Sequence, residues 1–131
     1  MKMENNLKLE MSFDDILFQL SKGNTIEGLK KGRRWFGLHQ VKDWKNQFGY
    51  KFHIYSNDHL IDNKPHFHLI KESENIDCKI FFTGEISTCK GVNKLEKKVK
   101  EALDYFLSKP RIQALLVDFW NDKNPDLKIT L

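Results

Sequence analysis

The segments Phe48-Gly-Tyr-Lys-Phe-His-Ile-Tyr55 and Pro65-His-Phe-His-Leu-Ile70 alternate apolar and polar residues along most of their length. A period of two residues is typical of a β-strand that buries one face. The stretch between them, from Ser56 to Lys64, is rich in Asn and Asp, which favour loops. Together the three segments predict a β-hairpin, and the rest of the sequence is interpreted around it.

Strand alternation predicts which hairpin side chains share a face. The apolar positions are assigned to the core: Phe48, Tyr50, Phe52, Ile54, Phe67 and Leu69. Four polar side chains then fall on the opposite face: His53, Tyr55, His66 and His68. In an antiparallel pair His53 lies opposite His68, and Tyr55 lies opposite His66. Three imidazoles are therefore expected to share one small patch, over which His59 of the loop can fold.

This patch supports three interpretations. His53, His66 and His68 could ligate a metal ion, and three histidines with an open position suit catalytic zinc. The same histidines with Tyr55 could instead perform metal-free acid–base catalysis, with nearby cations stabilising phosphate charge, as in a small ribonuclease. In the third interpretation, the histidines are half-buried strand residues without a ligand.

Helical patterns precede and follow the hairpin. Ser12 is a suitable N-cap for a helix that buries Phe13, Ile16, Leu17 and Leu20 and ends near Gly23, and Thr25 can cap a short second helix that stops at Gly32. Arg33–Gln47 has a helical spacing of aromatic and aliphatic residues. After a third strand at Cys78–Phe82 and an irregular or extended piece at Glu85–Lys90, two helical stripes follow, separated by Pro110. Their apolar residues are Leu95, Val99, Ala102, Leu103 and Phe106, and then Ile112, Leu115, Leu116, Phe119 and Trp120.

These elements predict an α+β fold. We expect a small antiparallel sheet of three to four strands, with the C-terminal helices packed on its Phe-rich face and extra N-terminal helices. A chain of 131 residues with 40% hydrophobic residues is the size of one domain, so residues 1–131 are expected to share a single core. Within it, residues 1–47 form an N-terminal helical extension, and residues 48–121 hold the hairpin and the helices.

Positive charge is concentrated in one part of the chain. The net charge is +4, yet the stretch from Lys30 to Lys51 holds many cations and a single acid, Asp43. Such a segment can attract nucleic acid, although a solvated basic face without a ligand gives the same pattern. The candidate nucleic-acid-binding residues are Lys30, Lys31, Arg33, Arg34 and Lys51.

The sequence also suggests a compartment. No apolar run approaches the roughly 20 residues that cross a bilayer, and the first ten residues lack the apolar centre of a secretion signal. We therefore expect a cytoplasmic protein without a membrane partner. In that setting the two cysteines, Cys78 and Cys89, are expected to be free thiols rather than a disulfide.

Two short motifs resemble a bacterial family. The run Tyr55-Ser-Asn-Asp-His59, followed by Pro65-His-Phe-His68, is similar to the family catalogued as domain of unknown function 4160, and Leu116–Trp120 is a looser match. The resemblance covers about residues 48–121, and Asp58 stands where an acid is usual in the family. It implies a small bacterial protein whose genes often occur in pairs that resemble toxin–antitoxin modules. It implies no catalytic assignment.

The functional expectation is a toxin–antitoxin or defence-module component that acts on nucleic acid, specifically RNA, through the histidine-rich hairpin. The expected partners are RNA or a cognate protein. Two alternatives remain: a non-enzymatic protein-interaction module, and a zinc-binding protein with zinc as its cofactor.

Overall fold

The structure is a computed structural model that describes residues 2–31, 47–56, 58–90 and 95–130, except for the side chains of residues 2–8 and 11. The elements follow one another as α1 (Lys2–Ser21), α2 (Ile26–Lys31), β1 (Lys51–His53), β2 (His66–Lys71), η2 (Glu72–Glu74), β3 (Ile76–Phe81), β4 (Ile86–Lys90), α3 (Lys97–Leu107), α4 (Pro110–Lys123) and η3 (Pro125–Leu127). The helical segment predicted for Arg33–Gln47 lies, except for Gln47, outside the described residues.

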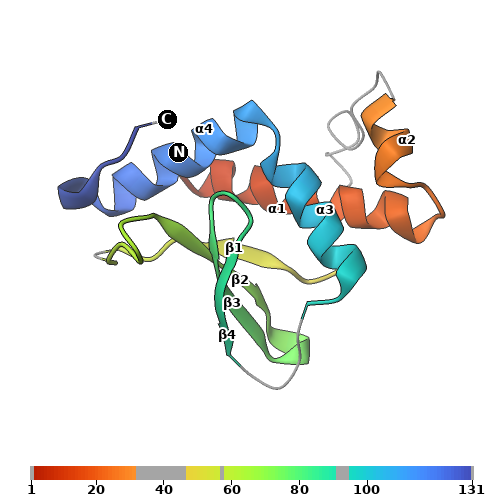
Figure 1. Ribbon diagram of the computed structural model, residues 1–131, viewed down its shortest axis with the longest axis horizontal. Coiled ribbons are helices and arrows are strands. Elements are labelled where there is room, and N and C mark those ends of the chain that lie inside the picture. Colours follow the sequence, from red (N-terminus) through yellow and green to blue (C-terminus); the bar gives the residue numbers. More distant parts are fainter. Residues whose placement is uncertain (1, 32–46, 57, 91–94, 131) are drawn as a thin grey trace.

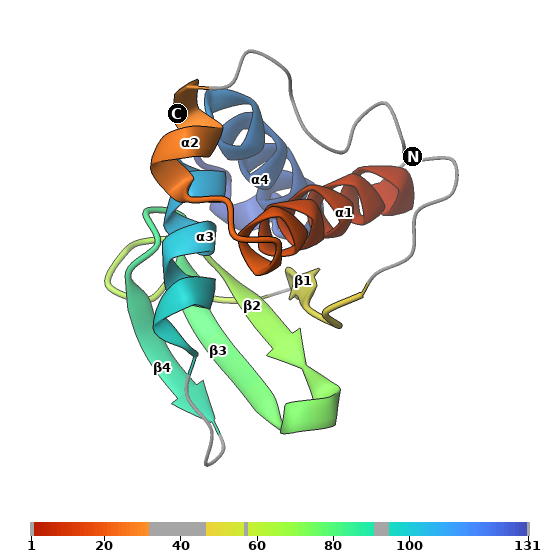
Figure 2. The ribbon, with the colours of Figure 1, turned by 90° about the vertical axis from the view of Figure 1, so that its right-hand side faces the viewer.

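The fold has two layers, and the α+β prediction is confirmed. The strands form one four-stranded sheet in the order β1-β2-β3-β4, and every neighbouring pair is antiparallel. The helices lie together on one side of this sheet, with α1 crossing above β1 (Figure 1 and Figure 2). The other side of the sheet carries the polar face of the hairpin.

The hairpin has the predicted register. His53 pairs with His68 and Phe52 pairs with Leu69 across β1 and β2. The strands also alternate as predicted, because Phe52 and Ile54 are buried whereas His53 and Tyr55 are exposed. β1 is shorter than predicted, so Tyr55 lies beyond its end.

One aromatic cluster joins the helices to the sheet. The ring of Phe13 on α1 is fully buried and lies edge-on to Tyr50 and Phe52, with centroid distances of 5.7 and 5.5 Å. Phe106 of α3 contacts the same rings, at 5.7 Å from Phe13 and 5.3 Å from Phe52. Such edge-to-face pairs stabilise a core beyond their buried area. The N-terminal helix is therefore part of the same core as the sheet.

Helix α1 begins ten residues before the predicted N-cap. Ser12 lies inside it, and Leu9, one turn before Phe13, is 1% exposed and extends the buried stripe. Asp14 on this helix is also buried, and its carboxylate accepts hydrogen bonds from the backbone N–H groups of Gln47 (3.0 Å) and Phe48 (2.8 Å). Burial raises the pKa of Asp14, while these two bonds favour its ionised form. Asp14 thus ties α1 to the segment that enters β1.

The remaining helices follow the sequence patterns closely. Thr25 caps α2 by accepting a 3.0 Å hydrogen bond from the N–H of Gly28. Pro110 starts α4, as expected for a residue that lacks an N–H donor. The piece predicted as irregular or extended is the regular strand β4. None of the described helices is both long and apolar enough to cross a membrane.

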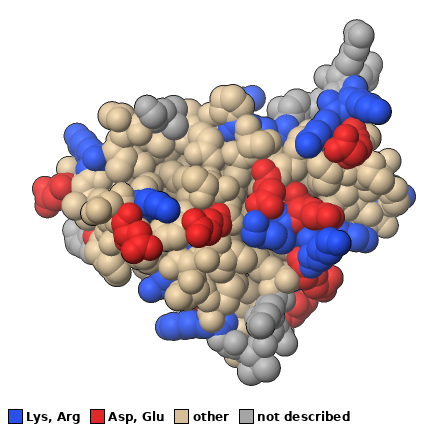
Figure 3. All heavy atoms as spheres, viewed as in Figure 1, with Lys and Arg blue, Asp and Glu red and all other residues tan. Residues whose placement is uncertain are grey.

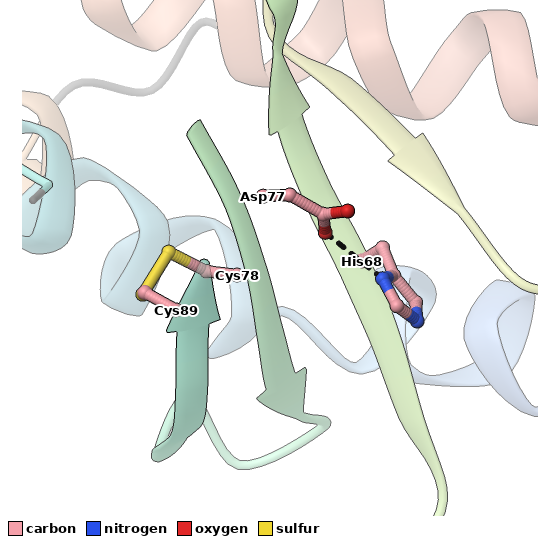
Figure 4. Close-up of a disulfide and its surroundings, with 4 residues drawn as sticks. All are labelled: His68, Asp77, Cys78 and Cys89. Carbon is pink, nitrogen blue, oxygen red and sulfur yellow. Dashed lines mark hydrogen bonds and ion pairs between the residues drawn. A yellow bond between two sulfur atoms is a disulfide. The ribbon is translucent and has the colours of Figure 1, made fainter. Parts of the chain in front are cut away.

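The prediction of two free thiols is wrong in this structure. Cys78 on β3 and Cys89 on β4 are directly paired across the sheet, with Cα atoms 3.9 Å apart, and they form a disulfide. The free-thiol prediction rested on the expected cytoplasmic compartment, and the pairing of β3 with β4 that brings the two cysteines together was not predicted. The disulfide joins the last two strands of the sheet (Figure 4).

The disulfide should contribute measurably to stability. In the Cys78→Ala/Cys89→Ala variant the free energy of unfolding should fall by about 3 kcal/mol, because the bond closes a loop with a sequence separation of 11. Urea unfolding with and without reductant measures this difference. Reductant should destabilise the wild type and leave the variant unchanged. Two titratable thiols in the denatured, unreduced wild type would contradict the disulfide.

Candidate metal-binding site

The loop that follows β1 is fixed by a residue from the end of the chain. Asn124, which follows α4 and is 2% exposed, accepts a 2.6 Å hydrogen bond from the backbone N–H of Asp58. Its amide nitrogen donates to the carbonyl oxygen of Tyr55 at 3.2 Å. The same amide therefore forms hydrogen bonds with the backbone on both sides of the turn. This places the Asp58 side chain against strand β2.

Asp58 completes a cluster with two histidines of β2. One potential ligand atom from each of Asp58, His66 and His68 lies within 4.8 Å of the other two. Asp58 Oδ2 lies 3.2 Å from His66 Nε2. Ligand atoms at the usual 2.0–2.1 Å from a tetrahedral zinc ion are about 3.3 Å apart, which matches this spacing. We call these three residues the Asp58–His66–His68 cluster.

His66 is the most unusual member of the cluster. Its side chain is fully buried, against Trp120 on one side and His68 on the other, with ring centroids 5.8 and 5.5 Å away. Neither ring nitrogen has a hydrogen-bond partner among the described residues, since the approach to Asp58 does not meet hydrogen-bond geometry. Burial lowers the pKa of His66 despite the nearby Asp58 carboxylate. The lowered pKa favours the neutral imidazole, which is the form that binds metal ions.

The other two members are oriented by neighbouring groups. His68 Nδ1 lies 3.0 Å from Asp77 Oδ1, and this contact leaves the Nε2 atom facing away from Asp77 (Figure 4). Asp58 Oδ1 accepts a 2.8 Å hydrogen bond from the N–H of His59 and lies 3.1 Å from His59 Nδ1. Oδ2 of Asp58 is then the atom directed at His66. Carboxylates and backbone groups hold metal-ligating residues in the same way.

The patch does not form quite as the sequence predicted. His53 faces His68, but it is not among the residues whose ligand atoms converge, and Asp58 takes that position. The His53 ring packs edge-on against Tyr55 at 4.2 Å, and Tyr55 contacts His68 at 4.6 Å rather than facing His66. Burial also lowers the pKa of His53. His59 does lie over the patch, 6.1 Å from the ring of His66.

Three of the predicted nucleic-acid-binding residues, Lys30, Lys31 and Lys51, are among the described residues, and none of them belongs to the Asp58–His66–His68 cluster. Lys30 and Lys31 are on α2, where Lys30 pairs with Glu27 at 3.8 Å. Lys51 on β1 pairs with Glu72 at 3.3 Å, and Arg33 and Arg34 lie outside the described residues. On the face drawn in Figure 3, acidic and basic side chains lie beside one another.

Different lysines border the cluster. A cavity of about 400 Å³ is lined by Asp58 and His68 on one side and by Lys79 and Lys90 of the next strands on the other. We call it the lysine cavity. Lys79 is there because it pairs directly with His68 across β2 and β3.

Two of the three converging residues, His66 and His68, were predicted from the sequence, whereas the residues that support them were not. A sequence signal for Asp58 exists, since it stands in the quoted Tyr-Ser-Asn-Asp-His motif. Asp77 and Lys79 had a weaker one, because alternation along β3 places them on the face opposite Cys78. Asn124 is more than 60 residues from the loop that it holds, and nothing in its local sequence indicated that contact.

No protein-family model, curated protein or solved structure matches this chain. The likeness to domain of unknown function 4160 therefore stays a prediction that rests on the quoted motifs.

The lowered pKa of His66 predicts acid-sensitive stability in protein kept free of metal by a chelator. The unfolded chain binds a proton on this imidazole near the ordinary pKa of 6.5, but the buried ring in the folded chain binds it only at lower pH. The contribution of His66 to the free energy of unfolding is complete above the ordinary pKa of 6.5. It is lost as the pH falls towards the lower pKa that His66 has in the folded chain. Urea unfolding at about pH 7.5 and about pH 5.5 measures the loss.

The His66→Leu variant is the comparison for this experiment. It removes the titrating ring, so its stability should fall less between the two pH values than that of the wild type. Some acid dependence should remain, since the pKa of His53 is lowered as well. An identical loss in both proteins would contradict the assignment to His66.

Proposed function

We propose that this protein binds a divalent transition-metal ion, zinc, through Asp58, His66 and His68. The observation that carries the proposal is the ring of His66, whose nitrogens are buried without a hydrogen-bond partner among the described residues while pointing into a cluster of two other ligand-type side chains. A buried polar group without a partner costs about 1–3 kcal/mol, and a bound ion would remove that cost.

The donor set favours zinc. Two imidazoles and one carboxylate are the protein ligands of several catalytic zinc sites, which keep a fourth position for water or substrate. The lysine cavity borders Asp58 and His68, so the open position would face a space that a small ligand can enter. A zinc ion in such a site supplies Lewis acidity and an activated water. The protein's own contribution is to orient Asp58 through Asn124 and His59, and His68 through Asp77.

The substrate that we propose is RNA, in the setting of a toxin–antitoxin or defence module. Two observations support it: the cationic side chains near the cluster, and the resemblance of the loop and β2 motifs to a family with paired gene arrangements. Phosphodiester cleavage is a reaction that both an activated water and paired acid–base groups can perform.

A second candidate is metal-free acid–base cleavage of RNA. It is favoured by the 3.0 Å contact between His68 Nδ1 and Asp77, which would leave Nε2 as a proton acceptor. His53 and Tyr55 lie within ring contact of this histidine or of each other and could donate or relay a proton. A non-enzymatic interaction module is the outcome if neither cleavage nor metal binding is found.

Metal analysis tests the first proposal. Protein purified without an affinity tag should contain zinc at a molar ratio near one, measured by elemental analysis. The Asp58→Ala, His66→Ala and His68→Ala variants should each lose the ion. His53→Ala is the matched control, since it changes a histidine of the same patch outside the converging set, and it should retain the metal. A ratio near zero in the wild type would remove the proposal.

The orienting role of Asp77 gives a finer prediction. In the Asp77→Asn variant zinc affinity should fall by about 10- to 100-fold, because the amide holds the His68 ring less strongly and lowers its basicity. Competition with a chromogenic zinc chelator measures the affinity. Unchanged affinity would mean that Asp77 does not act through His68.

The RNA activity is tested by expression and by cleavage. If the cluster is catalytic, the wild-type chain should arrest growth, and the His66→Ala/His68→Ala variant should lift the arrest. Unchanged toxicity in that variant would refute the catalytic role. Cleavage of RNA by the purified protein should stop in the presence of a chelator if the ion is required. Cleavage that continues would favour the metal-free alternative.

A further inference from the structure

Every residue that lines the lysine cavity has a polar side chain. Its lining side chains are either charged or bear a hydroxyl or imidazole group, and its volume of about 400 Å³ is in the range that holds a small organic ligand. Asp58 and His68 form part of its wall, so a ligand in the cavity would lie next to the Asp58–His66–His68 cluster. Four strands contribute to the sheet surface here, since His53, His68, Lys79 and Thr88 are successive cross-strand partners.

The two lysines that line the cavity are hydrogen-bond donors that carry a positive charge. Neither Lys79 nor Lys90 has a carboxylate within salt-bridge distance among the described residues. The carboxylates are occupied instead, because Asp77 contacts His68, and Asp58 contacts His59 and His66. A cavity whose cations are unpaired and whose anions are engaged selects for an anionic ligand.

The net charge of the cavity depends on the cluster. Its two lysines balance its two aspartates in formal charge. A divalent ion on the cluster would leave an excess of two positive charges. Anion binding should therefore be stronger in the metal-loaded protein, which links the cavity to the proposed metal site.

The exposed aromatic ring at the rim adds a second feature. Tyr55 is 43% exposed although its ring contacts His53 and His68 at one edge. A partly exposed ring beside cations is the arrangement on which nucleic-acid bases stack while lysines hold the phosphate.

We infer that the lysine cavity binds the phosphate group of a nucleotide, through Lys79 and Lys90, with the base against Tyr55. The inference rests on the proposed function, for which it names the chemical class of the ligand and the residues that hold it. These residues differ from the basic segment that the sequence indicated. The ligand is either a free nucleotide or one nucleotide of an RNA strand, and both share this chemistry.

Binding is tested by calorimetric titration of the zinc-loaded protein with inorganic phosphate, with adenosine monophosphate and with a short single-stranded RNA. The Lys79→Gln/Lys90→Gln variant should bind the nucleotide probes at least about tenfold more weakly. For RNA, the slope of log affinity against log salt concentration should become shallower by about 0.7 for each lysine removed. Zinc content of the variant should be unchanged, because neither lysine belongs to the cluster.

Lys64→Gln is the matched control. Lys64 pairs with Glu85 at 3.9 Å and does not line the cavity, so this variant should bind as the wild type does. RNA binding without mononucleotide binding would identify the strand as the ligand, and binding of both would identify the nucleotide unit. Zinc-loaded protein that binds none of the three probes would overturn the inference, as would equal binding by the double variant.

Measuring the zinc content of the same samples distinguishes failure of the cavity inference from failure of the metal-site proposal. Protein that takes up no zinc but loses nucleotide binding in the double variant would remove the metal site and leave the cavity assignment in place. Protein with one zinc per chain but no lysine-dependent nucleotide binding would support the metal site and remove the cavity assignment.

Discussion

The first four residues of strand β2 are buried, histidines and apolar residues alike, and this constraint shapes the rest of the molecule. Phe67 and Leu69 are part of the hydrophobic core, whereas His66 packs against Trp120 and Asp58, and His68 packs against Tyr55 and Asp77. An apolar strand could be covered in this way without further consequence. A strand with two covered imidazoles needs partners for its nitrogens, because a buried polar group without one is costly. Asp77 is the hydrogen-bond partner of His68. The nitrogens of His66 have no such partner among the described residues and lie within the Asp58–His66–His68 cluster.

The cluster is held by parts of the chain that are distant in sequence. Asn124 fixes the backbone of the Asp58 turn from the end of α4, and Asp77 orients His68 from the neighbouring strand. The disulfide lies in the same strand pair that carries Lys79 and Thr88. Because each support comes from a different element, the geometry of the site depends on the whole fold being formed.

Charge connects the two proposals. The lysine cavity and the cluster share Asp58 and His68, and the balance between lysines and aspartates is even without an ion. A bound cation would turn this neutral space into one that attracts phosphate. The metal-free interpretation uses the same side chains differently, with His68 and Asp77 as a proton-transferring pair. Both interpretations give a role to the polar residues on a face that the fold largely covers.

The hairpin, its register and the helical stripes could be predicted from residue order alone, because they follow from periods of two and of 3.6 residues that act locally. Residue order placed His53 opposite His68 and Phe52 in the core, and both are confirmed. The sequence did not predict the neighbour of His66, the disulfide partner of Cys89 or the hydrogen bonds that Asn124 forms with the Asp58 turn. These depend on where a loop and a chain end lie in three dimensions, and no local period encodes that. The third member of the cluster is Asp58 rather than His53, and this follows from how the loop folds in three dimensions.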